Sequence, residues 1–458
     1  MLGDWIRRTG FWVLDFVRGG IISKNYRDIK RRMETGTLNQ EQLSRLLSHA
    51  IKTVPYYKVE FQPNCFEEFP VIDKNIIKKR WDKLHSKAYL GKPVHYMATS
   101  GSTGTPFVME WDMGKRKRQI AELIYFNELA GQKLGQPYIY FRVWTENNRK
   151  SKKELWMQNL TPINILHLDD NTMEIIRKRL KSKPYINCCL AYASTYEYLE
   201  KYLTSKGDTS DMFNTKTLIS GSEVLSMRSK RAIKERIGCM VIDRYSNEEN
   251  GFLAQSGDMS DEFDVNIASF RIEILKQDCN EPAAIGEVGR IVVTDLYSFA
   301  VPLIRYDTGD LAIKAAEKDG WTTKLKTIQG RRVDVIYDTK GNPLTAHTWS
   351  VYMWKYDKLK QYQFIQEDEK KYLLKVNGSK GIYEDEEMIL HLKSVLGEDA
   401  EVKIEHVDGI PTLSSGNLKK PFVFISPQNN YIRKLVWRVR STLVIVMKYN
   451  EVMVRIYE

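Results

Sequence analysis

Short apolar stretches alternate with amphipathic stretches through the middle of the chain. The apolar stretches, rich in β-branched and aromatic residues, occupy residues 138–144, 163–168, 185–192, 216–221 and 240–245. The amphipathic stretches, with apolar residues every three or four positions, occupy residues 174–182, 195–205 and 226–237. Strands that alternate with helices in this way form βα units, whose strands pair in parallel. The pattern therefore predicts an α/β core with a mostly parallel sheet.

The pattern changes twice towards the C-terminus. At residues 263–306 the helical stretches disappear and strand-like segments dominate, which predicts a β-rich subdomain that closes the large domain. After Gly330, short strands accompany one clear helix at 385–397, as is typical of a small α+β domain. A length of 458 residues suits two domains. We expect a large N-terminal domain over 1–329, a small mobile C-terminal domain over 330–426 and a C-terminal extension over 427–458.

The first residues combine helical apolar spacing with positive charge. The apolar residues at this spacing are Leu2, Trp5, Ile6, Val13, Phe16 and Val17, and arginines flank them. This predicts an amphipathic helix that could lie on a membrane surface. Asp15 interrupts the apolar stretch and no Ala-x-Ala cleavage site follows, which argues against a signal peptide. No run reaches the roughly 18 apolar residues that a spanning helix needs.

Much of the net charge of +12 lies at the two ends. Residues 1–32 hold eight Lys or Arg against three Asp, and residues 427–458 hold six against two Glu. Such basic ends attract acidic lipid headgroups or other polyanions, or they simply form a solvated surface. We expect no nucleic-acid partner, because the basic residues are not interleaved with aromatic ones. Five cysteines without a CxxC pair suit a reducing cytoplasm, and peripheral contact with the inner face of the membrane fits the basic ends.

A loop rich in glycine and hydroxyl groups spans Thr99–Pro106. Its candidate phosphate-binding residues are Ser100, Gly101, Ser102, Thr103, Gly104 and Thr105. Glycines let backbone N–H groups approach a polyphosphate closely, while the hydroxyl groups donate further hydrogen bonds. No Lys-Ser/Thr pair closes the loop, so it is not a Walker motif. Alone, such a stretch is often only a flexible loop.

Polar residues follow two neighbouring strands of the predicted sheet. Residues 220–225 follow one apolar strand and residues 243–251 follow another. Ligands of α/β sheets bind at the carboxyl ends of the strands. Tyr245 could stack on a purine there, and Glu249 could hold Mg²⁺ against phosphate oxygens. As isolated features, both are equally typical of turns and surface acids.

Two further motifs come later in the chain. In Arg305–Asp310 a glycine turn separates two aspartates at a strand end, and Asp310 could accept hydrogen bonds from both hydroxyl groups of a ribose. Gly330 and Arg331 follow at the change of pattern, where they supply a flexible point and a cation.

Together these motifs resemble the adenylate-forming ligases, over nearly the whole chain. The segments TSGSTGTP, YSNEE, VPLIRYDTGDLA and GRRVD occur in the order that this superfamily has. The segments GGIISKNYRDI, LLSHAIKTVPYY and FPVIDK look more like the capsular-polysaccharide (CapK-like) members than like the phenylacetate-CoA ligases of the same branch. The resemblance implies a large adenylation domain followed by a small mobile domain.

The resemblance also implies roles for individual residues. The loop from Ser100 to Thr105 would hold the ATP phosphates, with Thr103 taking part in catalysis. Glu249 would bind Mg²⁺ and act in catalysis, Asp310 would bind the ribose, and Arg331 would lie on the hinge side. The residues that would border the adenylate are Ser222, Glu223, Tyr245, Ser246 and Asn247.

The chain departs from the superfamily at two positions. Ser246 stands where glycine is usual, which is a modest change if the backbone there needs no positive φ. Asn417 stands where the superfamily has its catalytic lysine. Lys419 is our candidate replacement, with Lys420 as the alternative, because a lysine side chain is long and flexible.

The function implied is activation of a carboxylic acid with ATP and Mg²⁺ through an acyl-AMP intermediate. The acid would be an amino acid, a uronate or an aryl acid, and the acceptor an amine in a cell-surface polysaccharide precursor, giving an amide. An acyl- or aryl-CoA synthetase, with coenzyme A as the thiol acceptor, is the nearest alternative. A weakly catalytic, membrane-associated nucleotide-binding scaffold is the alternative from another class, and Asn417 favours it.

Overall fold

The fold was analysed in a computed structural model of the 458-residue chain. The structure describes residues 2–98, 108–144, 149–165, 169–222, 225–329, 336–341, 343–344, 352–356, 359, 361–377, 381, 383–407 and 422–425.

Three helices begin the chain, and the first is the predicted amphipathic one. They are α1 (Leu2–Val17), α2 (Ile21–Thr35) and α3 (Gln40–Thr53). Helix α3 ends at Thr53, because Val54 is extended before Pro55. A π-helical turn at Tyr56–Phe61 then continues the chain.

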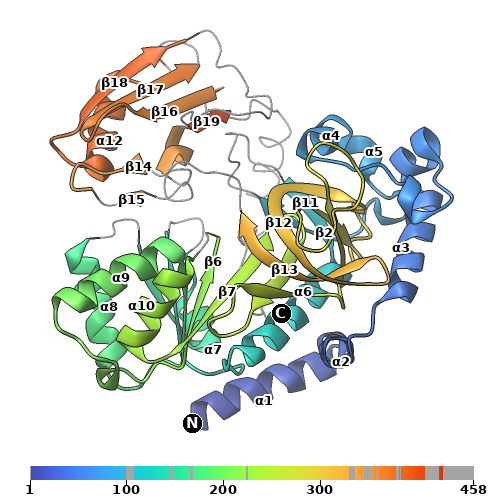
Figure 1. Cartoon of the computed structure of the whole chain (residues 1–458), viewed down its shortest axis with the longest axis horizontal. Helices are drawn as coiled ribbons and strands as arrows, with labels where there is room; N and C mark the ends of the chain where they lie inside the picture. The colour runs from blue at the N-terminus through green and yellow to red at the C-terminus, as the bar shows by residue number, and fades with distance from the viewer. Residues whose placement is uncertain are drawn as a thin grey trace.

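One sheet of eleven strands forms the body of the molecule, in the order β10-β11-β12-β13-β9-β8-β7-β6-β5-β3-β4 (Figure 1). Its parallel part consists of β3 (Tyr138–Arg142), β4 (Leu160–Asn164), β5 (Cys188–Tyr192), β6 (Thr217–Gly221) and β7 (Met240–Asn247). The helices that intervene are α7 (Lys152–Gln158), α8 (Asp170–Lys181), α9 (Ala193–Ser205) and α10 (Met227–Ile237). The α/β prediction is confirmed.

Helices cover both faces of the parallel part. Apolar residues of α8, α9 and α10 share one core with alternate residues of the strands, including Cys189 and Leu218. The remaining alternate residues, such as Cys188 and Ile219, face the other side with Ala130, which follows α6 (Met113–Leu129). Burial on both faces explains why these strands are apolar without strict alternation.

The β-rich part continues the same sheet with antiparallel strands. These are β8 (Gly251–Ser256), β9 (Glu262–Val265), β10 (Phe270–Leu275), β11 (Val288–Asp295), β12 (Tyr306–Lys318) and β13 (Trp321–Gln329). The prediction of strands here is confirmed, but the sheet as a whole is less parallel than expected, because six of its strands are these antiparallel ones. The hairpin β1 (Val94–Ala98) and β2 (Val108–Asp112) is a separate sheet. Short helical segments lie at α4 (Lys74–Lys79), α5 (Trp81–Leu84), Phe66–Glu68, Lys87–Tyr89 and Ser210–Met212.

A smaller sheet with its own helix completes the fold. It has the order β18-β17-β16-β19, and β17 and β18 pair in parallel while the other pairs are antiparallel. The elements of this part are β14 (Ile336–Tyr337), β15 (Pro343–Leu344), a helical turn at Trp354–Tyr356, β16 (Gln361–Gln366), β17 (Lys371–Asn377), α12 (Asp385–Leu396), β18 (Glu401–His406) and β19 (Phe422–Ile425). Met388 and Leu392 of α12 pack on Phe364 and Leu374 in a core of their own. The small α+β part is therefore present, as predicted.

Candidate functional site

Several predicted site residues lie outside the described residues. These are Ser100, Gly101, Ser102, Thr103, Gly104, Thr105, Glu223, Arg331 and Lys419, together with Asn417 and Lys420. The structure does describe the two strands that border the predicted phosphate loop. Ala98 at the end of β1 pairs with Val108 at the start of β2, so the two ends of the loop segment lie side by side.

The carboxyl ends of β6 and β7 carry the next group of predicted residues. Ser222 follows β6 with a positive φ of 66° and is exposed. Tyr245, Ser246 and Asn247 form the last residues of β7, next to β8. The register shifts between Tyr245 and Ser246, and Ser246 does not have a positive φ. Serine in place of the usual glycine therefore causes no backbone strain at this position.

Tyr245 and Asp310 are brought together by the fold. The Tyr245 hydroxyl donates a hydrogen bond of 2.8 Å to Oδ2 of Asp310, across 65 positions of sequence. Burial raises the pKa of Tyr245 well above 10, and the neighbouring Asp310 carboxylate raises it further. The phenol therefore stays protonated and acts as a donor that orients the carboxylate. This contact joins the end of β7 to β12.

A bulge in β12 presents Asp310. Val292 of β11 pairs with Asp307, whereas Arg290, two positions earlier, already pairs with Leu311, so residues 308–310 lie outside the regular ladder. Gly309 has φ 78°, a conformation that side chains disfavour, and its N–H bonds to Oδ1 of Asp307 at 2.9 Å. We expected this segment to end a strand, but β12 continues to Lys318. The glycine turn is thus a bulge within a strand.

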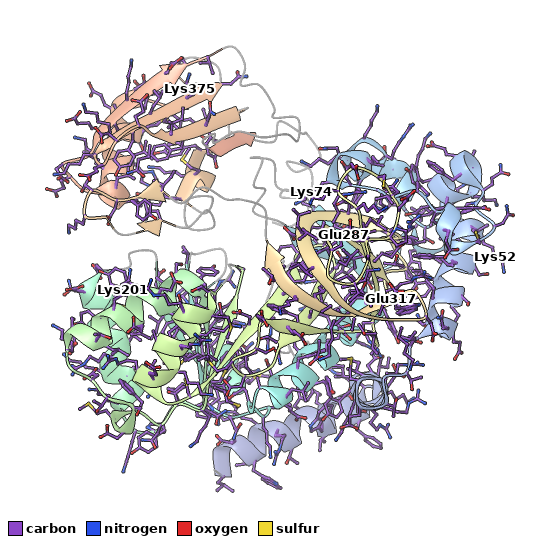
Figure 2. All side chains as sticks on the ribbon, viewed as in Figure 1. Lys52, Lys74, Lys201, Glu287, Glu317 and Lys375 are labelled. Carbon is purple, nitrogen blue, oxygen red and sulfur yellow. The ribbon has the colours of Figure 1, made fainter. Side chains whose placement is uncertain are left out.

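Glu249 lies buried at the end of the β7–β8 turn and is paired with a lysine. Its side chain is 6% exposed, and its Oε1 lies 2.8 Å from Nζ of Lys74. Lys74 is the first residue of α4, whose N-cap is Asp73 (Lys74 is labelled in Figure 2). Lys74 ends the segment FPVIDK but was not singled out as a site residue, because its partner lies 175 positions away in the sequence.

Two other segments converge on the same place. The indole N–H of buried Trp111, in β2, donates to the backbone carbonyl of Glu249 at 3.0 Å. Ile72 bridges to Tyr306 at the start of β12. The hairpin that borders the phosphate loop and the start of α4 therefore meet at Glu249. The segment before α4 also contacts β12 at Tyr306, four residues before Asp310.

Two asparagines near Glu249 have amide groups without partners. Asn250 is fully buried, and neither its Nδ2 nor its Oδ1 makes a hydrogen bond. Asn247 accepts a bond from the Asn250 backbone N–H at 2.7 Å, but its own Nδ2 has no partner. Leaving such groups unpaired costs about 1–3 kcal/mol each. An unexplained cost of this kind next to Glu249 is typical of a site that binds a polar ligand.

The donor set around Glu249 suits Mg²⁺ bound to a nucleotide. No group of three or more His, Cys, Asp or Glu in the part of the chain that the structure describes could hold a metal ion by itself. Mg²⁺ bound to substrate phosphates commonly uses only one or two protein carboxylates, with water completing its shell. A single buried carboxylate that already pairs with a cation fits this kind of site.

Comparison with known proteins finds a matching family model and a similar protein. Residues 336–423 match the model of the CapK C-terminal domain. Protein CapK of Staphylococcus aureus is 24% identical over 428 residues, covering 87% of this chain and 91% of that protein. The resemblance to CapK-like, adenylate-forming proteins is confirmed.

Solved structures give the same fold. A 2-hydroxyisobutyryl-CoA ligase in complex with 2-HIB-AMP and CoA, in its thioesterification state, superposes with a TM-score of 0.54 at 15% identity. The match covers 88% of this chain and 91% of that chain. The same ligase in its postadenylation state gives a TM-score of 0.51 with the same coverage. The CapK-like chain therefore has the fold of adenylate-forming CoA ligases, including the small C-terminal domain.

Proposed function

We propose that this chain activates a carboxylic acid with ATP to form an acyl-AMP and then transfers the acyl group to an acceptor. The observation that carries the proposal is the contact between Tyr245 and Asp310, in a fold shared with adenylate-forming ligases. Buried Glu249 follows Tyr245 by four residues. Chain segments distant in sequence supply these groups. In this proposal a bound polar ligand pairs with the amides of Asn247 and Asn250, which have no partner within the protein.

In the proposed site, Asp310 accepts hydrogen bonds from the ribose hydroxyl groups. Its Oδ2 already accepts the Tyr245 hydroxyl, which fixes the plane of the carboxylate. Its backbone N–H lies 3.1 Å from Oγ1 of Thr308, which in turn donates to the carbonyl of Ile291. The Tyr245 hydroxyl therefore orients the carboxylate and Thr308 holds the backbone of Asp310, which limits the reorganisation that nucleotide binding needs. Tyr245, Ser222, Glu223, Ser246 and Asn247 border the adenylate.

Glu249 is the proposed Mg²⁺ ligand. When bound, Mg²⁺ would neutralise charge on the phosphates and on the departing pyrophosphate. Lys74 balances the Glu249 carboxylate in the structure at 2.8 Å, and its ammonium group could turn to a phosphate oxygen once Glu249 binds metal. The loop from Ser100 to Thr105 supplies the remaining phosphate donors in this proposal, with Thr103 as a catalytic residue.

The reaction needs no protein nucleophile. The substrate carboxylate attacks the α-phosphorus in line, the bond to pyrophosphate breaks, and a mixed anhydride forms. The residues act by positioning the reactants and stabilising charge. Lys419 is the proposed replacement for the catalytic lysine, and Arg331 the proposed cation on the hinge side. The domain boundary near residue 330 belongs to the same proposal.

For the second step we propose an amine acceptor in a cell-surface polysaccharide precursor, giving an amide. This acceptor follows from the resemblance of GGIISKNYRDI, LLSHAIKTVPYY and FPVIDK to the capsular-polysaccharide (CapK-like) members of the superfamily. A coenzyme A thiol is the second candidate, because the solved ligase with the same fold was captured with CoA. Five free cysteines support the expected cytoplasmic location.

The experiment that separates the two acceptors measures AMP release. The full chain is incubated with ATP, Mg²⁺ and an acid, with coenzyme A or an amino sugar added in turn. Acid-dependent AMP release that rises with the amino sugar, but not with coenzyme A, supports amide formation. A rise with coenzyme A alone, together with thioester formation, would replace the amide ligase by a CoA synthetase.

A further inference from the structure

Helix α1 turns its apolar side away from the protein. Six large apolar side chains of this helix are between 47% and 81% exposed, and Phe16 and Val17 are the most exposed at 81% and 74%. The others are Leu2, Trp5, Ile6 and Val13. At 100° per residue these six positions fall on one side of the helix. A helix that packs on a globular protein normally shows the opposite arrangement.

Polar groups hold α1 in this orientation. The Asp15 carboxylate accepts hydrogen bonds from the backbone N–H groups of Ile22 and Ser23 at 3.0 and 2.9 Å, at the start of α2. Arg7 donates to the backbone carbonyl of Trp156 at 2.7 Å. Asp4 accepts a bond of 3.2 Å from the Asn159 amide. The body-facing side of α1 is therefore fixed, and its apolar side is left to solvent as a consequence.

The apolar surface extends from α1 onto α7. A groove of about 520 Å³ lies between them, and its apolar lining includes Phe11, Leu14 and Met157. Trp156 of α7 borders the groove and is itself 61% exposed. In Figure 1, α1 runs along the outer edge of the molecule, next to α7. We call the six exposed side chains of α1, together with Trp156, the α1 face.

Cations surround the α1 face. Arg8 is partly exposed, and Arg18 at the end of α1 and Lys153 of α7 are exposed. The nearby acids already have partners: Asp4 and Asp15 as described above, and Glu154 in the capping box with Ser151. Over α1 with Arg18 and over α7, the five cations Arg7, Arg8, Arg18, Lys152 and Lys153 outnumber the three acids, so the net charge of this edge is positive and complements an anionic surface.

We propose that the α1 face docks on an anionic lipid bilayer, with α1 lying in the plane of the interface. Exposed Trp, Phe and aliphatic side chains enter the boundary between headgroups and acyl chains, while the flanking Arg and Lys contact the headgroups. Within the described part of the chain, no helix is long and apolar enough to cross a membrane. The face lies apart from Glu249 and Asp310, so docking and adenylation can be tested separately.

The test is co-sedimentation of the full chain with vesicles of phosphatidylcholine containing about 30% phosphatidylglycerol. The variant Phe16→Ser/Val17→Ser removes the two most exposed side chains, and we expect its partition coefficient to fall at least tenfold. The matched control Ile285→Ser/Leu390→Ser changes two side chains of similar exposure, 66% and 72%, elsewhere on the surface and should bind like the wild type. Arg8→Glu/Arg18→Glu should also lose at least tenfold.

Circular dichroism confirms that each variant folds. Three results would overturn the proposal. The wild type could fail to bind the vesicles, or the Phe16→Ser/Val17→Ser variant could bind as tightly as the wild type. Finally, the wild type could be a dimer that this variant converts to a monomer without any vesicle binding, which would assign the face to a second copy of the chain.

Discussion

Asp310 and Tyr245 are distant in the sequence but form a hydrogen bond in the structure. The sequence suggested both as nucleotide-binding residues, from a turn motif and from an aromatic residue at a strand end. It did not suggest that the Tyr245 hydroxyl would bond to Asp310, because that contact depends on how β7 and β12 lie in one sheet. Lys74 and Trp111 were not chosen as site residues for the same reason, since only the tertiary fold brings them to Glu249. Asn250 neighbours Glu249 in the sequence, but its burial and its unpaired amide depend on the fold.

Removing the Tyr245 hydroxyl should weaken nucleotide binding. In Tyr245→Phe the ring remains, but Asp310 loses the donor that orients it, and we expect KM for ATP to rise about tenfold with a smaller change in kcat. ATP titrations of the adenylation rate measure this. A KM equal to that of the wild type would show that the Tyr245 hydroxyl does not orient Asp310 for nucleotide binding.

Glu249→Gln tests the metal-binding role. The substitution keeps the shape of the side chain and removes its charge, so adenylation should fall at least tenfold, most strongly when Mg²⁺ is limiting. The control Lys74→Met removes the partner of Glu249 and should not shift the Mg²⁺ dependence towards higher concentrations. If the Glu249→Gln variant has the same adenylation rate as the wild type at limiting Mg²⁺, Glu249 is not the metal ligand.

Asn250→Ala should separate stability from activity. The buried Asn250 amide has no hydrogen-bond partner. Asn250→Ala should therefore lower the free energy of unfolding by at least about 1 kcal/mol less than the substitution of a buried asparagine that is hydrogen-bonded. Asn39 is that control, since its amide donates to Ala268 and Tyr297 at 2.9 and 3.2 Å. Urea unfolding compares the two variants, and adenylation should fall only in Asn250→Ala. Equal destabilisation, with activity retained, would make Asn250 a structural residue.

At the scale of elements, hydrophobic patterning predicted which segments form strands and helices, but not the register in which the strands pair. Each apolar stretch between 138 and 245 contains or overlaps a strand, and the helix at 385–396 was also predicted. The bulge at 308–310 was mistaken for a strand end, because a glycine between aspartates is compatible with both. Only the pairing of β11 with β12 distinguishes them.

Gly309→Ala tests the importance of the bulge. A side chain at φ 78° is strained, so the variant should lose about 1–2 kcal/mol of unfolding free energy. Asp310 should move with the bulge, which raises KM for ATP. Gly341→Ala, at φ 80° with open space around the added carbon, is the matched control and should lose similar stability without any change in KM. Identical kinetics in the two variants would contradict a role for the bulge in placing Asp310.

At the scale of the whole molecule, the order of the motifs was more informative than any single motif. Four segments spread over more than 200 residues matched one superfamily in order, and the fold and the CapK similarity agree with that inference. The acid and the acceptor could not be predicted, because such pockets are formed by side chains scattered through the chain. The exposed apolar side of α1 was predicted as a pattern, but its direction relative to the protein required the structure.

ATP–pyrophosphate exchange across a panel of amino acids, aryl acids, short fatty acids and uronic acids tests the central claim most directly. The account predicts exchange that depends on one class of acid and that is lost in Asp310→Ala, despite Asn417. The absence of exchange with every acid, in a folded protein that still binds ATP, would contradict adenylation and favour a nucleotide-binding scaffold.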